Sequence, residues 1–201
     1  MVTIMKTLTY VTTADIRDLT WPVVEENIGL YTPALRVLTD FKTSSPRLIE
    51  PNVRADVLVE IMKKEHVRMK IVVDSQNNFL GVVSLEDLSE EAFIKRIAEG
   101  YVRDELLAID LMRAKEDLLA VSLKSLAGSD IESLILSQKN NAHQHLLVVD
   151  EETMSIRGLV SANDIVRQLK LSIDVSTSTS FAKLNEILEH EYADSKRIRV
   201  A

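Results

Sequence analysis

Two segments of the sequence each place a hydroxyl and a carboxylate three residues apart, behind a glycine. They are Gly81, Ser84 and Asp87 in the first copy and Gly158, Ser161 and Asp164, 77 positions later, in the second. An ionised carboxylate can accept hydrogen bonds from both hydroxyls of a ribose. A serine at the start of a helix lies where free backbone N–H groups attract a phosphate, and a glycine lets a ligand approach the backbone closely. The spacing therefore predicts a ligand-binding element that occurs twice.

The same spacing also suits a purely structural role. Ser-x-x-Asp resembles a capping box, in which the serine and the acidic residue satisfy backbone N–H groups at a helix N-terminus. Such a cap contributes about 1 kcal/mol to helix stability without any ligand. Spacing alone leaves both roles open, for Ser84 with Asp87 and for Ser161 with Asp164.

The segments around the two copies repeat one order of elements: strand, helix, strand, strand, helix. In the first copy these elements are predicted at 47–49, 53–65, 69–74, 79–83 and 85–99. In the second copy they are predicted at 118–123, from 129 onward, and at 146–150, 156–160 and 162–171. The strands are rich in β-branched residues between turn signals, and the helices have apolar residues at helical spacing. One such unit is too small to bury its own sheet, so we expect the two units to pack together.

The segments before and after the repeat have no counterpart in it. Thr32 followed by Pro33 predicts a helix that begins there and runs through Phe41. The tail carries an apolar stripe at helical spacing, formed by Phe181, Leu184, Ile187, Leu188 and Tyr192. This stripe either packs on its own domain, which we favour, or contacts a second subunit.

Both copies contain a strand that ends in Val-Val-Asp, a short turn, and a Gly-x-x-Ser-x-x-Asp segment that opens a helix. On these motifs the sequence resembles the CBS domain pair, or Bateman module, over residues 43–171. The resemblance implies an α+β fold of tandem β-α-β-β-α units that form one pseudo-two-fold module, with extra helical segments at both ends. It divides the chain into a helical leader, a first CBS unit, a connector with the second CBS unit, and a helical tail, at 1–42, 43–99, 100–171 and 172–201.

The resemblance also implies a function. CBS pairs commonly bind AMP, ADP, ATP or S-adenosylmethionine in clefts between their units, form homodimers, and regulate another protein. No transporter, kinase or synthase domain is recognisable in this sequence, so the regulated partner is expected to be a separate chain. The alternative is a ligand-free CBS pair that serves homodimerisation or protein interaction.

The residues around the two copies differ in charge. Glu86 and two further glutamates surround the first copy and would repel a phosphate. Arg167 and Lys170 follow the second copy. We therefore expect the second site, which includes Arg167, to accept a phosphorylated adenosine. The first site is expected to be degenerate or to accept an uncharged nucleoside.

Composition narrows the class of protein. The net charge of -7 and the pI near 5.2 argue against binding to nucleic acid or to an anionic membrane. The sequence has no cysteine, which excludes disulfides and thiolate metal sites and suits a cytoplasmic protein. His143 and His145 lie two residues apart, but no further ligands cluster near them in the sequence, so no metal site is predicted. No set of nucleophile, base and orienting residue is recognisable, so we expect the protein not to be an enzyme.

Overall fold

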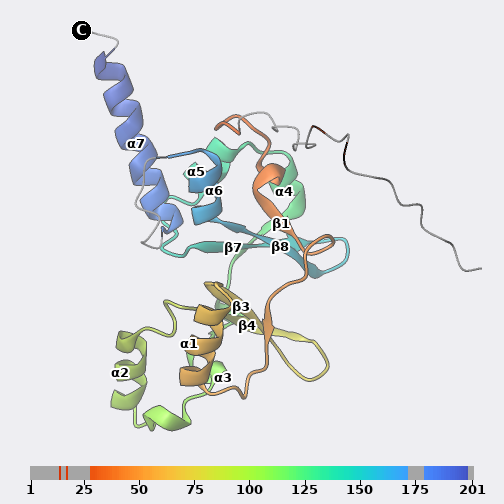
Figure 1. Cartoon of the computed structure of the whole chain (residues 1–201), viewed down its shortest axis with the longest axis vertical. Helices are drawn as coiled ribbons and strands as arrows, with labels where there is room; N and C mark the ends of the chain where they lie inside the picture. The colour runs from red at the N-terminus through yellow and green to blue at the C-terminus, as the bar shows by residue number, and fades with distance from the viewer. Residues whose placement is uncertain (1–13, 15–16, 18–27, 172–178, 199–201) are drawn as a thin grey trace, which may run out of the picture.

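The computed structural model describes residues 14, 17, 28–171 and 179–198 (Figure 1). It contains two four-stranded sheets, each covered by helices on one face. This is the α+β arrangement of two β-α-β-β-α units that the sequence predicts. Within the described part of the chain, no helix is long and apolar enough to cross a membrane.

The first unit is built on a sheet with the strand order β2-β3-β4-β5. Its strands are β2 (Leu48–Ile49), β3 (Met69–Val73), β4 (Phe79–Ser84) and β5 (Arg113–Ala114). Its helices are α1 (Ala55–Lys64), α2 (Glu90–Ala98) and α3 (Ala108–Leu111), with a 3-10 turn at Arg103–Glu105. The predicted helix at 85–99 therefore begins five residues late, at Glu90. The reason is a local cap, because the Ser89 side chain accepts a hydrogen bond from the Ala92 backbone N–H.

The second unit is built on a sheet with the strand order β1-β8-β7-β6. Its strands are β1 (Leu38–Asp40), β6 (Ala120–Ser122), β7 (His145–Asp150) and β8 (Ser155–Ser161). Its helices are α4 (Leu123–Ala127), α5 (Ile131–Ser137) and α6 (Ala162–Gln168), with 3-10 turns at Ala34–Val37 and Lys115–Asp117. Asp130 caps α5 by accepting a hydrogen bond from the Ser133 backbone N–H, as the sequence suggests.

The prediction of a helix from Thr32 through Phe41 is wrong. The segment forms a 3-10 turn at Ala34–Val37 and then enters strand β1. Here long-range pairing overrides local propensity, because Leu38–Asp40 lies antiparallel to β8 and completes the second sheet.

The two units exchange a strand. β1 precedes the first unit in the chain but pairs with β8 of the second unit. β5 precedes the second unit but pairs with β4 of the first. Each exchanged strand lies against one of the repeated glycines, with Asp40 opposite Gly158 and Ala114 opposite Gly81. The exchange ties the two units into one module.

Three apolar clusters hold the layers together. One fills the space between the first sheet and α1, α2 and α3, and another lies between the second sheet and its helices. The third joins the sheets to each other and includes Met69, Ile71 and Val82 from the first sheet and Leu147 from the second. The module is therefore a stack of helices, sheet, sheet and helices (Figure 1).

The tail forms helix α7 (Phe181–Ile198), which packs on α5 and α6 of the second unit (Figure 1). Phe181, Leu184 and Leu188 are buried in the core of that unit, so the stripe packs on its own domain as favoured above. The side chain of Tyr192, the last member of the stripe, lies outside the described part.

Candidate functional site

The clefts between the units combine segments from both. The turn before β3 of the first unit faces Ser161 and Asp164 of the second across a cavity of about 370 Å³, here called the Asp164 cavity. The turn before β7 of the second unit lines a larger cavity of about 670 Å³, to which the first unit contributes Arg113. Met69 and His145 line both cavities.

Asp164 faces its cavity from the first turn of α6. Ser161 is the N-cap of this helix and accepts a hydrogen bond of 3.4 Å from the Asp164 backbone N–H. The Asp164 carboxylate pairs with Arg167 of the same helix, and its side chain is 30 % exposed. Asp164, Ser161 and Arg167 therefore lie together at one cavity, and their role in binding stays a prediction.

The Asp164 cavity is rich in cations. Arg47 and Arg68 of the first unit line it together with Arg167 of the second. Asp164 is the one carboxylate among the described lining residues. Arg47 and Arg68 enter the site only through the packing of the two units, and the sequence-based prediction missed them. Lys170, the second cation expected near the site, is not a lining residue of this cavity.

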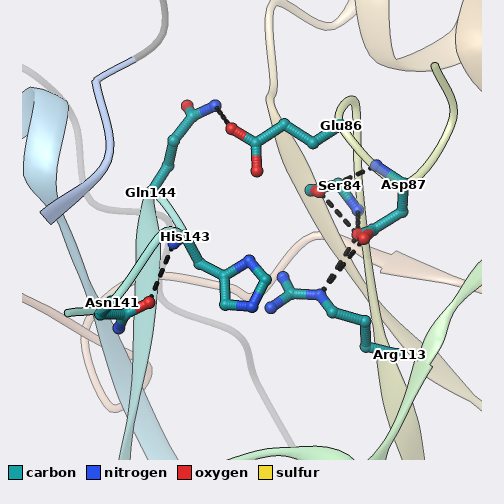
Figure 2. A network of polar contacts seen from close by, with 7 residues as sticks. All are labelled: Ser84, Glu86, Asp87, Arg113, Asn141, His143 and Gln144. Carbon is teal, nitrogen blue, oxygen red and sulfur yellow. Dashed lines mark hydrogen bonds and ion pairs between the residues drawn. The ribbon is translucent and has the colours of Figure 1, made fainter. Parts of the chain in front are cut away.

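The first copy is arranged differently. The Asp87 carboxylate accepts hydrogen bonds from the backbone N–H and the hydroxyl of Ser84, at 2.7 and 2.6 Å (Figure 2). Ser84 in turn accepts a hydrogen bond of 3.4 Å from the Asp87 backbone N–H. The first copy thus forms the reciprocal Ser-x-x-Asp hydrogen bonds of a capping box, but they close a turn, because α2 begins only at Glu90 behind its own cap at Ser89.

Arg113 and Gln144 contact the acidic side chains of the first copy. Arg113 Nε lies 3.3 Å from Asp87 Oδ1 and 3.4 Å from Oδ2. The Gln144 amide donates a hydrogen bond of 2.5 Å to Glu86 across the unit boundary. Figure 2 shows the Arg113 guanidinium between Asp87 and the His143 ring. Asp87 is not a lining residue of the larger cavity, whereas Arg113 is.

His143 and His145 are neutral at pH 7. Burial, opposed by the charge of Asp164 and assisted by Arg113 and Arg68, lowers the pKa of His145 to about 4. Burial, followed by the charge of Arg113, also lowers the pKa of His143. Neither histidine therefore adds positive charge to the cavities. In the described part of the chain, no three histidine or acidic side chains gather as a metal site would require.

The repeated glycines face the exchanged strands. A Cβ on Gly81 would lie 2.2 Å from the backbone oxygen of Arg113, and one on Gly158 would lie 2.3 Å from that of Thr39. Both glycines thus allow a neighbouring strand to approach. Contact of Gly81 or Gly158 with a ligand stays a prediction.

The comparisons with known proteins agree with this architecture. A family model of the CBS domain matches residues 38–93, which contain strand β1 and the elements from β2 into α2. The fold repeats the same β-α-β-β-α order in residues 120–168. Residues 38–93 therefore match the CBS domain, and the second unit repeats the fold of this segment. No curated protein matches the chain.

Solved structures are similar to this chain at low sequence identity. An uncharacterized conserved protein from Pyrococcus horikoshii is 13 % identical, with a TM-score of 0.53 over 73 % of this chain and 98 % of its own. A conserved CBS domain protein of unknown function, TA0289 from Thermoplasma acidophilum, is 19 % identical, with a TM-score of 0.48 over 77 % of each chain. CBSX2 in complex with AMP is 22 % identical, with a TM-score of 0.48 over 68 % of this chain and 94 % of its own.

Proposed function

We propose that this CBS pair binds a phosphorylated adenosine in the Asp164 cavity and regulates a separate partner protein in response. The observation that carries the proposal is the placement of a cavity-facing carboxylate beside three arginines that converge from both units. A ribose needs acceptors for two hydroxyl donors, which Asp164 supplies. A phosphate needs donors and positive charge, which guanidinium groups supply in a fixed planar geometry.

Different lining residues suit different parts of the ligand. Asp164 accepts from the ribose hydroxyls, and Arg47, Arg68 and Arg167 surround the phosphates. Met69 and Leu159 give the apolar wall on which an adenine ring packs. A ligand held in this way touches both units, so its binding stabilises their contact. A partner protein can respond to this stabilisation.

The charge of the cavity favours AMP, ADP or ATP over S-adenosylmethionine. A charge pair about 4 Å apart at a protein surface is worth about 4 kcal/mol before desolvation is subtracted. S-adenosylmethionine carries a sulfonium cation and an ammonium group and has no phosphate, so three nearby arginines disfavour it. We assign the module no catalytic role, because the charged groups at the clefts serve binding.

The test is thermal unfolding with adenosine, AMP, ADP, ATP and S-adenosylmethionine. A ligand at 100 times its dissociation constant adds about 2.7 kcal/mol of stability, which raises Tm by roughly 5–11 °C for a chain of this size. We expect a shift with a phosphorylated adenosine, a smaller shift with adenosine, and no shift for either with Asp164→Ala. Asp87→Ala is the matched control, which should keep the ligand shift. Equal shifts with AMP and S-adenosylmethionine would contradict the proposed role of the arginines.

A second candidate is a ligand-free pair that serves homodimerisation. One surface favours it. Ile94 and Ile97 on α2 are 61 % and 42 % exposed, and Tyr101 and Val102 beyond that helix are 46 % and 57 % exposed. In the second unit, α7 covers helices α5 and α6 (Figure 1). Analytical ultracentrifugation distinguishes the two cases, since Ile94→Asp would dissociate a dimer formed through this surface without changing nucleotide binding.

A further inference from the structure

The exchanged strands carry one residue of each half at equivalent register positions beside the repeated glycines. On β5, Ala114 lies opposite Gly81 and Arg113 lies opposite Val82. On β1, Asp40 lies opposite Gly158 and Thr39 lies opposite Leu159. Because the two glycines correspond in the repeat, Arg113 in the first half corresponds to Thr39 in the second.

This difference decides what each carboxylate contacts. Arg113 is long enough to reach Asp87, and the two side chains are 20 % and 14 % exposed. Thr39 carries no charge and has a short side chain, and Asp164 instead pairs with Arg167, which is 65 % exposed. Asp164 lines its cavity, while Arg113 rather than Asp87 lines the larger one.

We infer that Arg113 blocks the first of two otherwise similar adenosine sites and thereby limits this CBS pair to one ligand. The inference rests on the proposed function for the identity of the ligand. Arg113 is a specificity-determining residue, since its Nε donates a hydrogen bond to Asp87 Oδ2 and also lies 3.3 Å from Oδ1, the carboxylate oxygen to which Ser84 does not bond. Without Arg113, this oxygen faces a cavity of about 670 Å³ that also offers Leu118, Val121 and His143 to a ligand.

The opened site suits an uncharged nucleoside. Removing Arg113 takes away the positive charge next to Asp87, and Glu86 remains close by on the same turn. A phosphate would be repelled there, whereas the two hydroxyls of adenosine would meet the freed carboxylate oxygen. Adenosine is therefore the probe for this site.

The experiment measures the number of adenosine molecules bound, by isothermal titration calorimetry. We expect one for the wild type, two for Arg113→Thr, none for Asp164→Ala, and one for the double variant of Arg113→Thr with Asp164→Ala. Adding Asp87→Ala to the double variant should abolish that binding. Arg113→Gln, which is shorter than arginine and uncharged but keeps part of the aliphatic stem, serves if the threonine variant does not fold. Lys124→Thr removes the same charge from α4, away from either cavity, and should leave the count at one.

The outcomes separate this inference from the proposed function. One adenosine bound by the wild type and none by the double variant would overturn the inference and leave the Asp164 site intact. No binding by the wild type but one adenosine bound by the double variant would support the block by Arg113 and refute the proposed site. Two adenosine molecules bound by the wild type would overturn the inference, as would no binding by any variant.

Discussion

The exchanged strands depend on two glycines that have no room for a side chain. In Gly158→Ala the new Cβ would lie 2.3 Å from the Thr39 backbone oxygen and 2.9 Å from Leu38 Cδ1. In Gly81→Ala it would lie 2.2 Å from the Arg113 backbone oxygen. Ordinary contacts begin near 3.4 Å. Strands β1 and β5 must therefore move by about an ångström, and the atoms that must move are backbone.

The magnitude follows from overpacking of a close-packed interface, which typically costs 1–3 kcal/mol. For a chain of this length each kcal/mol lowers Tm by about 2–4 °C. We therefore expect Gly158→Ala and Gly81→Ala each to lower Tm by roughly 2–12 °C in a calorimetric scan. Gly81→Ala should also displace Arg113, which carries the blocking contact to Asp87.

Gly128→Ala is the matched control. The nearest atoms to a Cβ at Gly128 are backbone oxygens at 3.7 and 3.8 Å, an ordinary contact distance. Its Tm should stay close to that of the wild type. Equal Tm values for Gly81→Ala, Gly158→Ala and Gly128→Ala would refute the reasoning that Gly81 and Gly158 are needed for the close approach of the exchanged strands.

Further predictions concern stability in both halves. Arg157 bonds to the Asp40 carboxylate at 2.7 Å through two nitrogens and, with a smaller backbone contribution, lowers the Asp40 pKa from 3.8 to about 2. Asp40→Asn should therefore lower the urea midpoint at pH 7. The difference in midpoint between the wild type and Asp40→Asn should shrink as pH falls from 3.8 to about 2. A difference that stays constant over this pH range would contradict the stabilising role of the ionised Asp40. Phe181→Ala should cost about 3–5 kcal/mol in urea unfolding, because this side chain is fully buried, whereas the exposed Lys183→Ala should change little. An unchanged midpoint for Phe181→Ala would mean that α7 does not pack on the second unit.

The central strands are confirmed by the structure because their signals are local. β-branched runs bounded by polar turns predict strands at 69–74 and 79–83, and β3 and β4 lie at Met69–Val73 and Phe79–Ser84. The exchanged strands have no such signal. β1 and β5 span three and two residues, and Asp40 finds its partner Gly158 far along the chain.

In the site, too, some residues could be predicted from the sequence and others could not. The hydroxyl and the carboxylate of each copy are neighbours in sequence, so their spacing predicts the Ser161 and Asp164 pair. Spacing could not show that Arg113, 26 positions away, pairs with Asp87, because only the pairing of β5 with β4 brings this arginine there. Arg47 and Arg68 come from the opposite unit, and only the packing of the sheets brings them to Asp164.

The most direct test is a crystal structure of the protein grown with whichever adenosine nucleotide raises Tm most. We expect one nucleotide per chain in the Asp164 cavity, with the ribose hydroxyls on the Asp164 carboxylate and the phosphates near Arg47, Arg68 and Arg167. A nucleotide bound against Asp87 instead, with Arg113 displaced, would contradict both the choice of site and the block.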